Sequence, residues 1–191
     1  GTAGRACADC HRDAAESMKG VAARYPAFDE KRGAPVNLEG RINLCRTEHQ
    51  QAPALALEGR ELLALTAYVA RQSRGMPIES SDARLVPFIG KGRALFTARQ
   101  GQLNLACSQC HDDNWGKSLA GIPMPQGHPT GYPIYRLEWQ SLGSLQRRLR
   151  NCMIGMRAEP FAYGSEDYVA LETYLMWRAR GMTMESPGVR P

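Results

Sequence analysis

Residues 7–11 read Cys-Ala-Asp-Cys-His and residues 107–111 read Cys-Ser-Gln-Cys-His, so the pattern C-x-x-C-H occurs twice in a chain of 191 residues. Two residues between the thiols allow both sulfurs to reach one haem, and the adjacent histidine then lies under the iron as its proximal ligand. A redox disulfide needs only a single C-x-x-C, and zinc would need both pairs on one metal, which leaves both histidines unexplained. The two complete motifs therefore predict two covalently bound haem c groups.

Each motif supplies three residues to its haem. The predicted attachment residues are Cys7, Cys10 and His11 for the first haem, and Cys107, Cys110 and His111 for the second. Haem is attached to thiols outside the cytoplasm, where unpaired thiols are rare. We therefore expect a periplasmic protein, and the two cysteines outside the motifs need an explanation.

The charge of the chain is basic but gives no sign of nucleic-acid binding. The formal net charge is +5, and the propionates of two haems would offset most of it. No apolar run approaches the roughly 18 residues that cross a bilayer, so we expect no membrane span. No signal peptide is visible, so the sequence is expected to be a mature or trimmed form.

The two halves of the sequence resemble each other beyond the motifs. Residues 61–76 match residues 167–182, and residues 41–45 match residues 148–152. Each longer stretch has apolar residues at helical spacing, and each is predicted to form a helix that stops at Arg-Gly-Met, where glycine suits a helix C-terminus. Each unit thus runs from a haem motif through a loop and a lone cysteine to a closing helix. This order predicts a mainly α protein of two tandem cytochrome c-like domains related by internal duplication.

The domain boundaries follow from the repeat. We expect an N-terminal domain over residues 1–78, a linker over residues 79–90 in which serines and a proline break helices, and a C-terminal domain over residues 91–191. A leading helix is predicted around residues 91–99 of the second domain. Only six residues precede Cys7, so we expect the N-terminal domain to be truncated.

The two cysteines outside the motifs, Cys45 and Cys152, stand just ahead of the closing helices, where a c-type cytochrome usually places a methionine ligand. A thiolate is a good ligand for ferric iron and lowers its reduction potential relative to methionine. The symmetric placement favours His11 with Cys45 on the first iron and His111 with Cys152 on the second. The alternatives are a Cys45–Cys152 disulfide, ligation by Met124 or Met153, and ligation by His49 or His128.

Basic residues surround Cys152 in the sequence, and Glu159 is the only nearby acid. The neighbouring arginines are Arg147, Arg148, Arg150 and Arg157. Guanidinium groups lower the pKa of a nearby thiol and hold a dianion by forked hydrogen bonds, so they predict a small-oxyanion site beside an activated sulfur. Arg148 has a counterpart in Arg41, so this arginine could instead hold haem propionates in both units.

At these residues the sequence resembles the A subunit of the SoxAX cytochrome, from the thiosulfate-oxidising Sox system. The resemblance covers nearly the whole chain, and its most specific part is Arg-x-x-x-Cys-x-x-x-x-Arg-Ala-Glu-Pro at residues 148–160. It implies an L-cysteine S-thiosulfotransferase, which joins thiosulfate oxidatively to a cysteine of the carrier protein SoxYZ while haem takes up the electrons. A small monohaem cytochrome, the X subunit, is the implied partner in a heterodimer.

The resemblance also implies roles for individual residues. His111 and Cys152 would ligate the catalytic haem, Cys152 being the cysteine that the family carries as a persulfide, and Arg148 would bind the substrate. His11 and Cys45 would ligate the other haem. The residues alone leave open a second function, a diheme electron shuttle without catalytic activity, and a third, a diheme peroxidase.

Overall fold

The structure is a computed structural model that describes residues 1–119 and 121–191. The α-helices are α1 (Cys7–His11), α2 (Ala14–Ser17), α3 (Leu38–His49), α4 (Arg60–Arg71), α5 (Val86–Thr97), α6 (Cys107–His111), α7 (Leu145–Gly155) and α8 (Glu166–Arg178), with 3-10 turns η1 (Ala22–Arg24) and η2 (Ala83–Leu85). The strands are β1 (Ala27–Asp29), β2 (Ala34–Val36), β3 (Ser118–Leu119), β4 (Ile122–Pro123), β5 (Ile134–Arg136), β6 (Ser141–Gly143) and β7 (Gly188–Arg190). Among the described residues, no helix has the length and apolar character to span a bilayer. Because the helices are the longer elements and each strand has only two or three residues, the prediction of a mainly α protein is confirmed.

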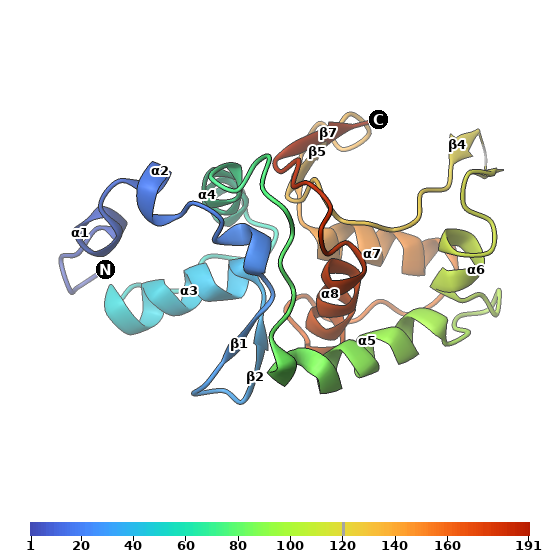
Figure 1. The fold of residues 1–191 in the computed structure, drawn as a ribbon, viewed down its shortest axis with the longest axis horizontal. Coiled ribbons are helices and arrows are strands. Elements are labelled where there is room, and N and C mark those ends of the chain that lie inside the picture. Colours follow the sequence, from blue (N-terminus) through green and yellow to red (C-terminus); the bar gives the residue numbers. More distant parts are fainter. Residues whose placement is uncertain (120) are drawn as a thin grey trace.

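The C-terminal half is organised by the crossing of α5 and α8, which lie against each other with α7 beside them (Figure 1). Gly92 makes the close approach possible, because a Cβ at this position would lie 2.1 Å from the carbonyl oxygen of Ala170 in α8. Apolar and aromatic side chains from the three helices form one core, in which the rings of Phe96 and Tyr174 lie 5.4 Å apart. This core forms one wall of the pocket described below.

Helix α5 begins earlier than predicted. It starts at Val86, so residues 86–90 are helical and only residues 79–85 connect the halves. Pro87 was interpreted as a helix breaker, but it occupies the first turn of α5. A proline is favoured there because the first turn leaves its backbone N–H groups without helical partners.

The two predicted closing helices are present as α4 and α8, and both end before their Arg-Gly-Met turns. The glycines of these turns, Gly75 and Gly181, have φ angles of +84° and +81°. The turns bind each other across the molecule, because Gly75 N–H donates to the carbonyl of Met184 and Gly181 N–H donates to that of Ile78, each at 2.9 Å. Ile78 and Met184 also belong to one buried cluster that draws on both halves. The halves thus share a core as well as a backbone junction.

The same local arrangement precedes each lone cysteine. Strands β1 and β2 form a hairpin that leads into α3, and strands β5 and β6 form a hairpin that leads into α7. The pairing register is the same in both hairpins after a shift of 107 residues, with Ala27 opposite Val36 and Ile134 opposite Gly143. A polar N-cap, Asn37 or Ser144, then starts each helix. Residues that share a place in the two arrangements can therefore be compared directly.

Candidate functional site

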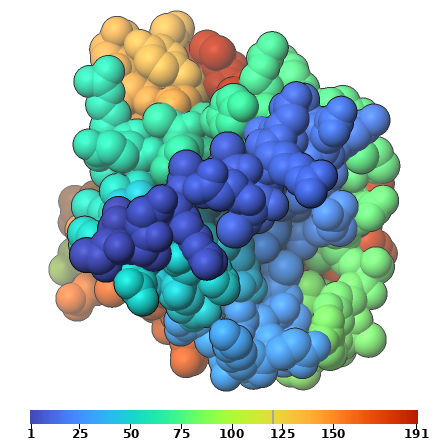
Figure 2. Space-filling view, turned by 90° about the vertical axis from the view of Figure 1, so that its left-hand side faces the viewer, coloured from blue at the N-terminus to red at the C-terminus, as the bar shows by residue number. Residues whose placement is uncertain are grey.

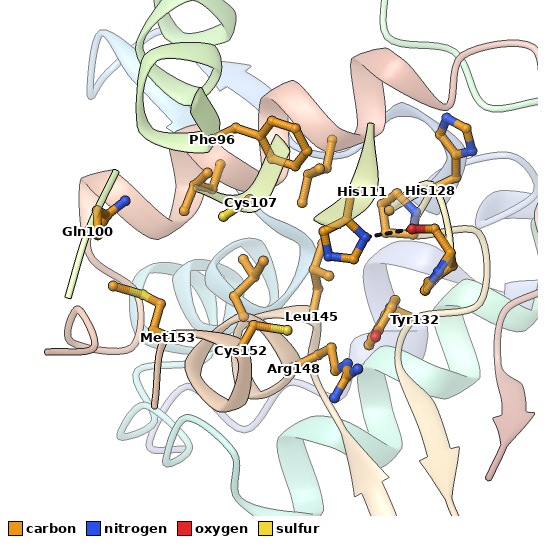
Figure 3. A pocket seen from close by; sticks show the side chains of 16 residues that line it. Phe96, Gln100, Cys107, His111, His128, Tyr132, Leu145, Arg148, Cys152 and Met153 are labelled. Carbon is orange, nitrogen blue, oxygen red and sulfur yellow. Dashed lines mark hydrogen bonds between the residues drawn. The ribbon is translucent and has the colours of Figure 1, made fainter. Parts of the chain in front are cut away.

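The second motif, the second lone cysteine and Arg148 meet at one pocket in the C-terminal half (Figure 3). The pocket encloses about 810 Å³ of space not filled by protein atoms, a volume that includes open solvent at its mouth. Its walls are mainly aliphatic and aromatic. The residues that line it are Phe96, Gln100, Cys107, His111, Pro125, Gly127, His128, Pro129, Tyr132, Leu145, Arg148, Leu149, Cys152, Met153, Leu171 and Leu175.

Helix α6 presents the second motif to this pocket. The helix starts at Cys107 because the side chain of Gln109 accepts a hydrogen bond, at 2.9 Å, from the backbone N–H of Ala106 just ahead of it. His111 Nδ1 lies 2.6 Å from the carbonyl oxygen of Pro125, and a carbonyl can only accept, so Nδ1 carries the proton. The other ring nitrogen is thereby left as the electron-pair donor, the arrangement that a metal-ligating histidine uses.

Cys152 reaches the same space from α7. Figure 3 shows its sulfur and the imidazole of His111 pointing into the pocket from different helices. Burial raises the pKa of the Cys152 thiol, while the charges of Arg148 and Arg136 act in the opposite direction without outweighing it. The predicted lowering by a neighbouring arginine is thus present, from Arg148, but the net pKa is raised because the loss of solvation is the larger effect.

These residues fit a c-type haem. The helix offers two thiols and a histidine with its distal nitrogen free, and the apolar pocket offers a third sulfur, from Cys152, as a second iron ligand. Met153 also lines the pocket, but this residue belongs to the core, is 4% exposed, and its sulfur accepts a hydrogen bond from Tyr168 Oη at 3.7 Å. His128 stands on the pocket wall, where burial and then the charge of Arg178 lower its pKa.

The first motif lies at the surface. Cys7, Cys10 and His11 are exposed, and Figure 2 shows the N-terminal segment, in dark blue, crossing the outer face of the molecule. Cys45 stands beside this motif, near enough for the charges of both motif thiols to act on it, and burial is the main cause of its raised pKa. Gln50 ties α3 to the motif by donating to the sulfur of Cys7 at 3.6 Å. The structure thus brings the first lone cysteine to the first motif.

All six cysteines are free in the structure, so Cys45 and Cys152 do not form the alternative disulfide. Each lies with its own motif. His49, one of the alternative ligands, is exposed at the end of α3.

The arginines next to Cys152 in sequence do not converge on it. Arg148 lines the pocket, whereas Arg147 stacks on Trp139 and Arg150 lies over Tyr163. Arg157 is exposed just after α7. The predicted four-arginine cluster is therefore wrong, because an α-helix turns by about 100° per residue and only a residue three or four positions away shares the face of Cys152.

Two further residues near Cys152 were missed by the sequence analysis, namely Tyr132 and Arg136. Burial raises the pKa of Tyr132 to about 12, and the charges of Arg148, Cys152 and Arg136 all act on its hydroxyl. Both residues lie in the 132–136 segment, which matches residues 25–29 at the same shift of 107. Extending the alignment N-terminally from residue 41 would have found this match, although not its meaning.

Comparison with known proteins agrees with this arrangement. The sequence profile described as SoxA/TsdA, cytochrome c domain, matches residues 1–78 and 91–184. The chain belongs to the SoxA/TsdA cytochrome c family. Family membership implies covalently bound haem c, which the residues of the pocket fit.

Relatives and a solved structure extend the match to the full chain. The L-cysteine S-thiosulfotransferase subunit SoxA of Pseudaminobacter salicylatoxidans is 41% identical over 192 residues, covering 100% of this chain and 67% of that protein. The subunit of the same name from Rhodovulum sulfidophilum is 38% identical over 191 residues, again covering 100% and 67%. The crystal structure of SoxXA from P. pantotrophus superposes with a TM-score of 0.95 at 33% identity, covering 100% of this chain and 72% of the matched one. The chain thus spans about two thirds of the length of these relatives.

Proposed function

We propose that this chain is the haem-bearing A subunit of an L-cysteine S-thiosulfotransferase, which joins thiosulfate oxidatively to a cysteine of a carrier protein. The observation that carries the proposal is the meeting of Cys152, Arg148 and the second C-x-x-C-H motif at one apolar pocket. Relatives that are 34–41% identical over the whole chain bear the name of this activity. The partner would be a small monohaem cytochrome X subunit, and the carrier would be SoxYZ.

We further propose two haems, in two tandem cytochrome c-like units related by duplication. Cys7, Cys10 and His11 with Cys45 would hold the first. Cys107, Cys110 and His111 with Cys152 would hold the second, and the positions of Cys107, His111 and Cys152 on the pocket wall support this assignment. The units would cover residues 1–78 and 86–191, and thioether attachment would place the protein in the periplasm.

The reaction forms one S–S bond between the outer sulfur of thiosulfate and a thiol, and it releases two electrons and the thiol proton. When bound, the haems supply one-electron acceptors for these electrons. Arg148 would hold the sulfonate oxygens, since a guanidinium fork matches an oxyanion and strengthens where water is excluded. Cys152 would provide the sulfur to which the substrate is brought, and the apolar walls would keep water from the new bond.

The test compares the two lone cysteines. Cys152→Ala is expected to abolish thiosulfate conjugation to the carrier protein, whereas Cys45→Ala should keep part of it, because only Cys152 has Arg148 at its pocket. Intact-mass spectrometry of each purified variant counts the attached haems and verifies that the loss is not a loss of cofactor. Equal loss of activity in both variants would contradict a special role for the second site and leave an electron shuttle as the function.

A further inference from the structure

The two sites are built on the same frame but carry opposite charges at one position. In each half a tyrosine precedes a short strand, and the third residue of that strand is Asp29 in β1 and Arg136 in β5. Asp29 lies opposite Ala34 in its hairpin, and Arg136 lies opposite Ser141 in the equivalent hairpin. The two residues therefore occupy the same place relative to the following helix.

In the first half this position neutralises the helix arginine. Arg41 Nη2 lies 2.6 Å from Asp29 Oδ2, and the Asp29 carboxylate is only 9% exposed. Although burial opposes ionisation of Asp29, hydrogen bonds from Arg41 and from backbone N–H groups outweigh it and lower its pKa. The guanidinium beside Cys45 is thus already occupied by an acid of the protein itself.

In the second half the equivalent arginine has no such partner. Within residues 1–119 and 121–191, no carboxylate lies within salt-bridge distance of Arg148. The residue that takes the place of Asp29 is itself a cation, and its side chain is 9% exposed. The charges of Arg136 and Arg148 both act on the Cys152 thiol and on the Tyr132 hydroxyl, so both guanidinium groups lie near these two side chains.

Arg136 is held by its own contacts but retains one free donor. Its Nε donates to the carbonyl oxygen of Pro191 at 2.8 Å, its Nη2 pairs with Glu138 at 2.8 Å, and the guanidinium lies 5.1 Å from the ring centre of Trp139. Its Nη1 is buried and has no hydrogen-bond partner among the described residues. A buried unpaired donor of a charged group is costly, so such a group is typical of a site that an absent anion completes.

We propose that Arg136 is a second binding residue for the oxyanion of the substrate, and that the exchange of Asp29 for Arg136 between the two halves confines oxyanion binding to the Cys152 site. This inference rests on the proposed function for the identity of the anion, thiosulfate. Arg148 supplies the unpaired positive charge. Arg136, whose own charge is paired with Glu138, adds its free Nη1 donor, and the charges of both arginines act on Tyr132. At the first site, an oxyanion would have to displace Asp29 from Arg41.

The test measures anion binding without turnover. Thiosulfate is titrated into the oxidised haem-loaded protein by calorimetry, with no carrier protein present, and sulfate is titrated in parallel as an inert dianion. We expect Arg136→Gln to weaken binding of both anions roughly 10- to 100-fold, the usual cost of one charge-assisted hydrogen bond. Arg136→Asp recreates the first site and should weaken binding further, because its carboxylate can pair with Arg148.

Matched variants separate this role from general charge or folding effects. Arg147→Gln removes a neighbouring arginine that stacks on the same Trp139 from 4.6 Å, and its affinity should stay within about twofold of wild type. Arg136→Lys retains the charge and should recover part of the affinity lost in Arg136→Gln. Haem absorbance per protein verifies that each variant is folded and loaded. In steady-state conjugation, Arg136→Gln should raise KM for thiosulfate more than it lowers kcat.

Unchanged anion affinity in Arg136→Asp would overturn the inference, as would an equal loss in Arg147→Gln. These outcomes leave the proposed function intact when the wild-type protein conjugates thiosulfate. Conversely, a wild-type protein that conjugates nothing refutes the proposed function, whereas the sulfate titrations still decide whether Arg136 binds an oxyanion.

Discussion

The crossing of α5 and α8 depends on one glycine, and its substitution gives a sharp test of the packing. A Cβ at Gly92 would lie 2.1 Å from the carbonyl oxygen of Ala170 and 2.6 Å from the Cβ of Tyr174. Gly90 is in the same helix two residues earlier, and a Cβ there would meet nothing within 4 Å. Gly92→Ala and Gly90→Ala therefore make the same chemical change in a tight place and in an open one.

The expected effects have opposite signs. Replacing an exposed helical glycine by alanine stabilises a helix by up to about 1 kcal/mol, so Gly90→Ala should raise the free energy of unfolding by about 0.5–1 kcal/mol. Gly92→Ala gains the same helix propensity, but the obstacle is backbone, which yields only if α5 and α8 separate. Overpacking of this kind costs about 1–3 kcal/mol or more. Because the obstacle is a backbone carbonyl, we take an overpacking cost of about 3 kcal/mol, which leaves a net loss of about 2 kcal/mol in the free energy of unfolding.

Denaturant unfolding of the haem-loaded variants, followed by far-ultraviolet circular dichroism, measures both effects. When the free energy of unfolding of both variants depends equally on denaturant concentration, their denaturant midpoints give the difference in stability, which is expected to be about 3 kcal/mol. A Gly92→Ala protein as stable as Gly90→Ala would refute the close crossing of the helices. A changed slope would instead show that the variant alters the unfolded state or the cooperativity of unfolding.

Two further perturbations test other parts of the structure. Burial, and then the nearby carboxylate of Glu39, raise the pKa of Glu172 to about 8. The folded protein therefore keeps a proton that the unfolded chain loses near pH 4.5. The stability that results is fully present below pH 4.5 and is lost as the pH rises through about 8. Glu172→Gln should remove this dependence of stability on pH. Between pH 5 and pH 9, the free energy of unfolding of the variant should therefore gain roughly 2–4 kcal/mol relative to that of wild type, as measured by thermal or denaturant unfolding. Parallel plots of stability against pH for the two proteins would refute this prediction. Arg178 Nη2 lies 2.6 Å from Asp112 Oδ1 and 3.2 Å from the carbonyl oxygen of Gln126. Arg178→Met should therefore speed amide hydrogen exchange around Asp112 and Gln126 at least several-fold. Unchanged exchange rates would show that these hydrogen bonds do not hold the segment after α6.

The sequence was most informative where chemistry acts over a few residues. C-x-x-C-H places two thiols and a histidine on one short helix whatever the surrounding fold, and α1 and α6 begin at their first cysteines as a result. The closing helices were found from the helical period of their apolar residues, because burial of one helix face is decided locally. The prediction erred at element ends, where Pro87 can start a helix as well as prevent one.

The sequence was least informative about which charges meet. Nearness in sequence suggested four arginines around Cys152, but the helix distributes them around its axis and leaves only Arg148 at the pocket. Arg136, in contrast, lies 16 residues from Cys152 in the chain, on a strand whose hairpin carries it back to α7. The action of the Arg136 charge on Cys152 depends on tertiary packing, so composition and periodicity could not reveal it.

The balance of forces on Cys152 explains why its arginines belong with an anion rather than with the thiol. Burial raises the pKa of the Cys152 thiol, and the charges of Arg148 and Arg136 offset this effect only in part. In the proposed haem site, iron coordination would favour the thiolate form of this sulfur. The positive charge of Arg148 then stays unneutralised by the protein, in a pocket of low dielectric where it attracts an oxyanion strongly. At the first site the carboxylate of Asp29 removes that attraction, so the proposed function would place substrate binding at Cys152 and electron transfer alone at Cys45.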